Sequence, residues 1–259
     1  MRFGIVGDPV NHSRSPAIHT AGFQARGIDA TYEYLPTPLG EFATVESMLR
    51  SGGLDGVSVT MPHKANAFAA VDTRTELANR TGAVNTIISN DGILTGTNTD
   101  VAGVRFSIDV VKALDGPVLV LGAGGAAAAA IVALEDRQVF VSARDRRDAA
   151  SVLGRTGVEG IVIPWSQGVA GSVVVNATPV GMHGEKLPAA PLAVASALID
   201  MAYGDGETPA CTYATSSGIN YADGIDMLVG QAVEAFTLFT GTDVPVDVLY
   251  DAARSGSAR

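Results

Sequence analysis

The sequence has few of the residues that cross-link or ligate small folds. It contains one cysteine, Cys211, and four histidines among 259 residues. A single cysteine excludes an internal disulfide, and the histidines and the cysteine lack the spacing of a paired CxxC or an HExxH motif. The sequence therefore predicts no structural zinc and no other metal site.

Basic residues and long apolar runs are also scarce. Seventeen lysines and arginines stand against 27 aspartates and glutamates, which gives a formal net charge of −10. That charge disfavours nucleic acid and anionic membrane surfaces as partners. No apolar run approaches the roughly 18 residues of a membrane span, and the first residues form a strand pattern rather than a charged leader. We expect a cytoplasmic protein without nucleic-acid or membrane partners.

Strand-like and helix-like periodicities alternate along the chain, which favours an α/β fold. NDG (90–92) between two apolar segments is typical of a hairpin turn. The pattern changes near DGP (115–117), and the length suits two domains. The predicted strands are 2–6, 31–35 and 56–60, those of the hairpin 83–89 and 93–99, and the predicted helices are 16–26, 41–50, about 64–80 and 101–114.

The segment HSRSPAIH (12–19) follows the first predicted strand and admits two interpretations. Ser15 followed by Pro16 is typical of an N-cap followed by the first helical residue. A helix start does not explain His12, Ser13 and Arg14. A hydroxyl-rich turn between a strand and a helix also suits a small polyhydroxylated ligand.

The segment PVLVLGAGGAAAAAIVAL (117–134) runs from a short apolar strand through a glycine-rich turn into an alanine-rich helix. Gly122 suits the tight turn, Gly124 lets a pyrophosphate approach the backbone, and the small Ala127 allows the helix to pack on a sheet. The phosphate would lie at the positive N-terminus of the helix. Because the strand QVFVS (138–142) follows at the expected interval, we predict a Rossmann-like, doubly wound dinucleotide-binding domain.

The residues after QVFVS leave the choice of cofactor open. At this strand end an arginine accepts the 2′-phosphate of NADP, whereas an acidic residue binds the ribose hydroxyls of NAD. The segment ARDRRD (143–148) contains both, Arg144 and Asp145. NADP is preferred if Arg144 faces the ribose and Asp145 turns away to pair with Arg147, and NAD is preferred if the roles reverse. The segment is also typical of a solvated loop.

Seven motifs in this order resemble the shikimate dehydrogenase family. They lie between Gly7 and about Gly241 and read GDPVNHSRSPAIH, SVTMPHK, AVNT, GTNTDVAG, GAGGAA, NATPVGM and DGIDMLVGQAVEAF. The resemblance implies a two-domain protein in which a nucleotide-binding domain interrupts a substrate domain. With the segment boundaries above, 1–103 and 224–259 form an α/β substrate-binding and catalytic domain, and 104–223 form the nucleotide-binding domain.

The resemblance also implies roles for the polar residues of these motifs. Lys64 and Asp100 match the catalytic pair of the family. A lysine ammonium can give a proton to the developing alkoxide in ketone reduction and stabilise its charge, and a neighbouring carboxylate orients it. Taken alone, Lys64 would be typical of a solvated charge at a helix start and Asp100 of a helix N-cap. The residues matching the substrate-binding set are Ser13 and Ser15, for the carboxylate of shikimate, and Thr60, Asn85, Tyr203 and Gln231.

The cofactor residues follow from the same resemblance, and one departure bears on them. Many family members have asparagine, arginine and threonine where this chain has Ala143, Arg144 and Asp145. Because Arg144 matches the phosphate-binding arginine of the family, we expect NADP, with NAD as the alternative. NATPVGM (176–182) should lie beside the nicotinamide. The residues matching the cofactor site are Gly122, Ala123, Gly124, Gly125, Ala126, Arg144, Thr178 and Gly224.

Three functions remain open from the sequence. The first is NADPH-dependent reduction of 3-dehydroshikimate to shikimate in aromatic amino-acid biosynthesis, by a monomer or homodimer. The second is a paralogue that acts on quinate or an aminoshikimate with NAD. The third is a ligand-sensing protein on the same scaffold, which would be expected to lose the lysine or the aspartate, whereas this chain has both Lys64 and Asp100.

Overall fold

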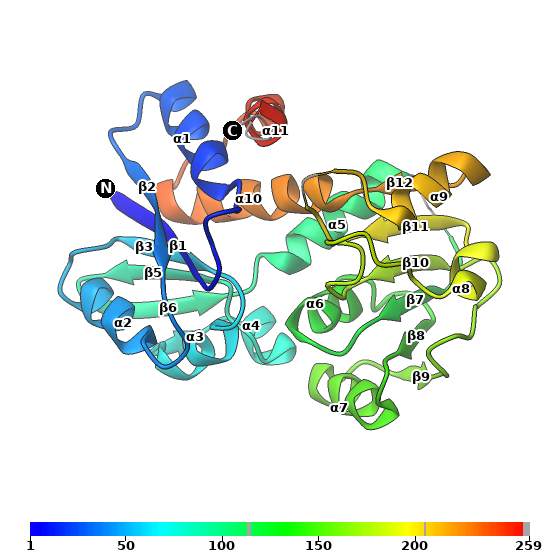
Figure 1. Ribbon diagram of the computed structural model, residues 1–259. Coiled ribbons are helices and arrows are strands. Elements are labelled where there is room, and N and C mark those ends of the chain that lie inside the picture. Colours follow the sequence, from blue (N-terminus) through cyan, green and yellow to red (C-terminus); the bar gives the residue numbers. More distant parts are fainter. Residues whose placement is uncertain (113–114, 205, 256–259) are drawn as a thin grey trace. The chain divides into compact units, whose positions relative to one another are not determined.

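The structure is a computed structural model that describes residues 1–112, 115–204 and 206–255. Its chain forms two compact units, one of Met1–Thr99 with Gln231–Arg259 and one of Asp100–Gly230. Each unit contains a six-stranded sheet covered by helices (Figure 1). The sequence places the divisions at 103/104 and 223/224. None of the described helices is long and apolar enough to cross a membrane.

The first unit contains a mixed sheet with strand order β2-β1-β3-β5-β6-β4. The strands β1, β2 and β3 are parallel, and β5 pairs antiparallel with both β3 and β6. Its strands are β1 (Arg2–Gly7), β2 (Thr31–Pro36), β3 (Gly56–Val59), β4 (Thr73–Arg74), β5 (Thr86–Asn90) and β6 (Ile93–Thr97). Its helices are α1 (Ser15–Arg26), α2 (Phe42–Arg50), α3 (Lys64–Ala70), α4 (Glu76–Thr81), α11 (Val246–Ser255) and the later part of α10 (Gly224–Thr240).

The predicted hairpin is confirmed. Asp91 and Gly92 form its two-residue turn, with φ angles of 51° and 78°. Two consecutive residues with positive φ are typical of a type I′ turn, whose twist matches that of the flanking strands. The turn sets the register in which Asn90 faces Ile93 and Ser89 faces Leu94.

The predicted N-cap at Ser15 is wrong. The N-cap is Arg14, and Ser15 is the first residue of α1. The backbone N–H of Ser15 donates to Ser13 Oγ over 3.3 Å, so the preceding serine satisfies a donor at the start of the helix. The hydroxyl of Ser15 is therefore not used as a cap.

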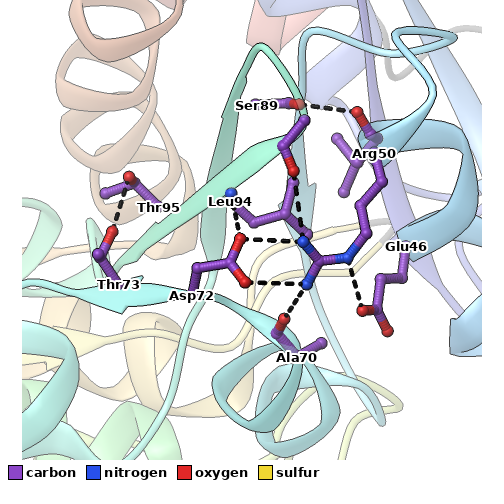
Figure 2. A network of polar contacts seen from close by, with 10 residues as sticks. Glu46, Arg50, Ala70, Asp72, Thr73, Ser89, Leu94 and Thr95 are labelled. Atoms are coloured by element: carbon purple, nitrogen blue, oxygen red, sulfur yellow. Dashed lines mark hydrogen bonds and ion pairs between the residues drawn. The ribbon is translucent and has the colours of Figure 1, made fainter.

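The single helix predicted around 64–80 is also wrong. After α3 the backbone becomes extended at Val71, and the short strand β4 pairs with β6. The second helix, α4, begins after the N-cap Thr75. Figure 2 shows the cause of the interruption. Asp72 accepts the N–H of Leu94 over 2.8 Å and binds the guanidinium of Arg50 at 2.9 Å, so this residue is held against the hairpin.

The second unit contains a parallel sheet with strand order β12-β11-β10-β7-β8-β9. Numbered within the unit, this is the 3-2-1-4-5-6 order of the dinucleotide-binding fold, which confirms the predicted Rossmann-like domain. Its strands are β7 (Val118–Leu121), β8 (Val139–Ser142), β9 (Gly160–Val162), β10 (Val173–Asn176), β11 (Ala197–Asp200) and β12 (Asn220–Ala222). Its helices are α5 (Asp100–Val111), α6 (Gly125–Ala133), α7 (Arg146–Thr156), α8 (Ala189–Ala193) and α9 (Pro209–Ser217). The last predicted positions of the first of these helices, 113–114, lie outside the described residues.

Apolar residues alternate between the two faces of this parallel sheet. Along β7, Val118 and Val120 pack into one core with α6, whereas Leu119 and Leu121 pack into a second core on the opposite face. Both sets are fully buried. A strand that is covered on both faces explains why the sequence here is continuously apolar rather than alternating.

The first unit contains a buried histidine among aromatic rings. His19 stacks on Tyr32 with ring centroids 4.3 Å apart and also lies near Phe23, Phe236 and Phe239. Neither ring nitrogen of His19 has a hydrogen-bond partner among the described residues. Burial lowers the pKa of His19 from its ordinary value to about 3, so the folded protein keeps this imidazole neutral.

This burial predicts a loss of stability in mild acid. Between the unfolded pKa near 6.5 and about pH 3, the unfolded chain takes up a proton on His19 that the folded chain does not. As the pH falls through this range, His19 should therefore lower the free energy of unfolding by about 1.4 kcal/mol per pH unit. In urea titrations from pH 7 to pH 4, His19→Leu should lose less stability than wild type by this slope. The exposed His12→Gln serves as control, and parallel wild-type and His19→Leu curves would disprove the assignment.

Candidate active site

The residues predicted to bind substrate from the first unit gather at one edge of its sheet. The strands β1, β3 and β6 end at this edge, and the antiparallel strand β5 begins there. Ligands of α/β proteins collect outside such strand ends, where loops can carry polar side chains. The segments at this edge carry Ser13, Ser15, Thr60, Lys64 and Asn85.

Ser13 and Ser15 form a hydroxyl pair in the turn after β1. Both are buried, and Ser13 Oγ donates to Ser15 Oγ over 3.2 Å. The turn is held by Ser13 N–H, which donates to the carbonyl of Val10, and by the hydroxyl of Tyr34, which donates to the carbonyl of Ser13. Two fixed hydroxyls in one turn suit a carboxylate, because they supply donors without a buried cation.

The segment after β3 carries Thr60 and Lys64 and is held by His63. The N–H of His63 donates to Thr60 O, and the buried His63 ring bonds the carbonyl of Thr37 through Nε2 at 2.6 Å. Since a carbonyl only accepts, Nε2 carries the proton. Lys64 is half-buried at the start of α3, and its carbonyl accepts the N–H of Val84, next to Asn85.

Asn85 and Gln231, 146 positions apart in the sequence, are joined by Thr99. Asn85 Oδ1 accepts the N–H of Thr99 at 2.8 Å, and Asn85 Nδ2 donates to Thr99 Oγ1 at 3.0 Å. Thr99 Oγ1 also donates to Gln231 Oε1 at 3.2 Å. The N–H of Thr99 can only donate, so it fixes the Asn85 carboxamide with Oδ1 toward Thr99. The hydroxyl of Thr99 links Gln231 to the same residue. Sequence analysis missed Thr99, although it precedes Asp100 in the motif GTNTDVAG.

Asp100 is the first residue of α5 and is buried. A carboxylate in the first turn of a helix is stabilised by the helix dipole, so the local structure alone accounts for an acid here. Lys64 belongs to the first unit and Asp100 to the second.

The glycine-rich turn between β7 and α6 fits a dinucleotide phosphate. Gly122 has a φ of 127°, which side chains rarely tolerate, and an added Cβ would lie 2.8 Å from the carbonyl of Ala177. At Gly124, the N-cap of α6, an added Cβ would meet no atom within 4 Å. The fold therefore leaves this face of the turn open. Gly124 has no side chain to cap the first N–H groups of the helix, which remain suited to an anion.

The other residues assigned to the turn lie around this opening. Ala123 is half-buried in the turn, and Gly125 and Ala126, also half-buried, are the first residues of α6. The small Ala127 behind them is buried in the core of the sheet, as its predicted packing role requires.

The loop NATPVGM is shaped by hydrogen bonds from its own side chains. Asn176 Oδ1 accepts from Thr178 Oγ1 at 2.6 Å, and Asn176 Nδ2 donates to Asp200 Oδ1 at 2.8 Å. Burial raises the pKa of Asp200, and the hydroxyl of Thr208 also donates to this carboxylate. The hydroxyl of Thr178 therefore holds the loop rather than pointing to an open surface.

Two further predicted residues lie against each other at the start of α10. Tyr203 is half-buried, and an added Cβ on Gly224 would lie 2.6 Å from Tyr203 Cβ and 2.7 Å from Ala202 O. Close packing within the second unit is thus sufficient reason for a glycine at position 224.

Arg144 and Asp145 differ in their contacts. Arg144 is exposed and makes no hydrogen bond or ion pair with the described part of the chain. Asp145 is the N-cap of α7 and binds the guanidinium of Arg147, with Asp145 Oδ2 and Arg147 Nη2 2.7 Å apart. The pairing of Asp145 with Arg147 is the one that the sequence analysis associates with NADP.

Within the described residues, no group of three or more histidines, cysteines, aspartates and glutamates is placed to hold a metal ion. Cys211 is buried, and burial raises the pKa of its thiol to about 12. A thiol that stays protonated is a poor nucleophile, so Cys211 has a structural role.

The second unit has a Rossmann sheet with an open glycine turn, and the first unit carries hydroxyls, carboxamides and a lysine on segments at one sheet edge. These features define the class of two-unit dinucleotide-binding α/β proteins. Residues 5–87 match the shikimate dehydrogenase substrate binding domain, and residues 224–254 match the shikimate 5′-dehydrogenase C-terminal domain. The chain belongs to the shikimate dehydrogenase family.

Individual relatives cover almost the whole chain. The shikimate dehydrogenase (NADP(+)) of Acidiphilium cryptum is 37% identical and covers 96% of this chain and 94% of its own length. The crystal structure of shikimate 5-dehydrogenase from Thermus thermophilus, in complex with NADP(H) and shikimate, has a TM-score of 0.89 at 33% identity and covers 99% of both chains. A second shikimate dehydrogenase structure, with NADP+, has a TM-score of 0.90 at 26% identity, over 100% of this chain and 96% of its own. The predicted fold class is confirmed.

The hydroxyl pair yields a testable prediction. The sequence assigns Ser13 to a substrate carboxylate that is remote from the reacting carbon, and such a group should be held equally in ground and transition states. Ser13→Ala tests this assignment. We expect KM for shikimate to rise severalfold while kcat changes little, as measured by initial rates. Ser47→Ala, in α2, is the control. An unchanged KM with lowered thermal stability would make the turn a purely structural one.

Proposed function

We propose that this protein is an NADP-dependent shikimate dehydrogenase, which converts 3-dehydroshikimate, NADPH and a proton reversibly into shikimate and NADP+. The observation that carries the proposal is the hydrogen-bonded set Asn85, Thr99 and Gln231, whose first member adjoins the Lys64 segment at the strand edge. Carboxamides held in one hydrogen-bonded set, on a segment next to one that carries a lysine, suit a ring with several hydroxyls and a reducible carbonyl. NADP-dependent relatives that match over nearly the full length support it.

In this proposal the first unit binds the substrate. Ser13 and Ser15 donate to the substrate carboxylate from their turn. Thr60, Asn85 and Gln231 are assigned to the ring hydroxyls and carboxylate, and Tyr203, which belongs to the second unit, is assigned a further contact. The rigidity of this set matters because hydroxyl recognition depends on which atom of each carboxamide faces the ligand.

Lys64 and Asp100 are assigned to the proton transfer. The positive Lys64 ammonium stabilises the negative charge that develops on the substrate's carbonyl oxygen and donates a proton to that oxygen. Asp100 is assigned as the second member of the catalytic pair, as the resemblance implies.

The second unit is assigned to the cofactor, in the domain predicted as 104–223. A nicotinamide dinucleotide bound there supplies a hydride. The N–H groups of Gly124, Gly125 and Ala126 would bind its pyrophosphate, with Gly122 and Ala123 shaping the turn. Arg144 would bind the 2′-phosphate. Thr178 and Gly224 are assigned to the nicotinamide side, Thr178 through the loop that it holds. We place the activity in the cytoplasm, in a monomer or homodimer, as expected in the sequence analysis.

Steady-state kinetics test the proposed function. Purified protein should oxidise shikimate with NADP+ at a higher kcat/KM than quinate with NADP+, shikimate with NAD+, or quinate with NAD+. A preference for quinate or for NAD+ would identify a paralogous dehydrogenase. Shikimate binding without turnover with any pair would indicate a ligand-sensing protein instead.

Two substitutions test the catalytic assignment. Lys64→Ala should lower kcat by on the order of 10²- to 10⁴-fold, as expected for loss of a general acid, while the Kd for shikimate rises much less. Asp100→Asn should share that loss, so the double variant should be little worse than Lys64→Ala, because the two groups act as a unit. Lys112→Ala, an exposed lysine, is the control. A nearly unchanged kcat in Lys64→Ala, or additive losses in the double variant, would contradict the assignment.

A further inference from the structure

The end of β8 presents two opposite charges in consecutive positions. Arg144 is exposed, and Asp145 follows it as the N-cap of α7. An acidic residue at this strand end ordinarily binds the ribose hydroxyls of NAD, and a free carboxylate would repel a 2′-phosphate bound by Arg144. If the chain uses NADP, this carboxylate must be kept from accepting the ribose hydroxyls and from repelling the 2′-phosphate.

Both oxygens of the Asp145 carboxylate are occupied by one residue. Oδ1 accepts the backbone N–H of Arg147 at 2.8 Å and Arg147 Nε at 3.2 Å. Oδ2 accepts Arg147 Nε at 3.2 Å and Nη2 at 2.7 Å. The carboxylate is therefore folded over the first turn of α7 by a cap bond and by a two-pronged guanidinium contact. The hydrogen bonds from Arg147 also lower the pKa of Asp145.

The neighbouring arginine does not share this contact. Arg146 points its Nη2 toward the carbonyl of Val162, 3.4 Å away, and makes no bond to Asp145 among the described residues. Position 147, two residues beyond the N-cap, is thus the one whose guanidinium closes on the acid. Arg146 and Arg147 are both exposed and adjacent, so one is a matched control for the other.

We propose that Arg147 determines cofactor specificity through Asp145: it binds the carboxylate, so that this acid neither accepts ribose hydroxyls nor repels a phosphate at Arg144. The inference rests on the proposed function and adds to it a residue that does not itself touch the cofactor. The pair adds little to stability, because the Arg147 side chain is 91% exposed and the Asp145 side chain 40% exposed. Its effect is expected in the selectivity between ligands rather than in folding.

Cofactor fragments allow the selectivity to be measured without turnover. Adenosine 2′,5′-bisphosphate carries the 2′-phosphate, and ADP carries the free ribose hydroxyls. Their Kd values would be measured by calorimetry at one fixed ionic strength for wild type, Arg147→Met, Arg146→Met, Asp145→Asn and the double variant Asp145→Asn/Arg147→Met. Asparagine keeps the capping oxygen, and circular dichroism checks that α7 is retained.

Arg147→Met should raise the ratio of the bisphosphate Kd to the ADP Kd about three- to tenfold, and Arg146→Met should leave it within about twofold. In the Asp145→Asn background, Arg147→Met should leave the ratio unchanged, because no carboxylate remains to be released. The same shift should appear in the ratio of kcat/KM for NADP+ and NAD+.

Other results would overturn the proposal. An unchanged ratio in Arg147→Met would refute it, as would an equal shift with and without the Asp145 carboxylate, which would mean that Arg147 attracts the phosphate directly. If the wild type oxidises shikimate with NADP+ while either result is found, only this inference fails. If the wild type binds neither fragment and oxidises no substrate, the proposed function fails, and the inference fails with it.

Discussion

The hydrogen bond from the Thr99 N–H to Asn85 Oδ1 is the constraint on which the substrate edge depends. It joins the end of β6 to the start of β5, two strands whose hairpin turn lies at the opposite edge of the sheet. The hydroxyl of Thr99 contacts both Asn85 and Gln231, and the N–H bond fixes which end of the Asn85 carboxamide faces it. A backbone donor is well suited to this task, because no rotamer change can turn it into an acceptor.

The sequence predicted the nucleotide unit well because its signals are local. The short apolar strands, the glycine turn and the alanine-rich helix lie within residues 117–142, and their order in the chain determines how they pack. The hairpin at Asp91 and Gly92 was predictable for the same reason, since its φ angles belong to the turn residues themselves. The chain length and the change of pattern near 115–117 predicted two domains, and the resemblance added that one interrupts the other.

The errors have the opposite origin. The break after α3 is imposed by Arg50, Leu94 and Gly96, which bond the backbone or side chains of 72–75 from distant positions. At the start of α1 the N–H of Ser15 donates to Ser13 Oγ, so a serine before the N-cap Arg14 does what the sequence assigns to Ser15. Thr99 was missed because it lies between β6 and α5, where a single threonine belongs to no periodic pattern. In the site, sequence motifs marked which segments matter, but not which hydrogen bonds orient their side chains.

The open face at Gly124 separates two kinds of selection. An alanine there would find no neighbouring atom within 4 Å, and its φ of −84° is ordinary for any residue. A library of variants screened only for folding would therefore accept side chains at position 124, whereas Gly122, crowded by Ala177, would reject them in the same screen. Screening the survivors for nucleotide capture would then remove the substitutions at 124. Positions that accept side chains in the folding screen but lose them in the nucleotide screen would thus mark the surface that contacts the ligand.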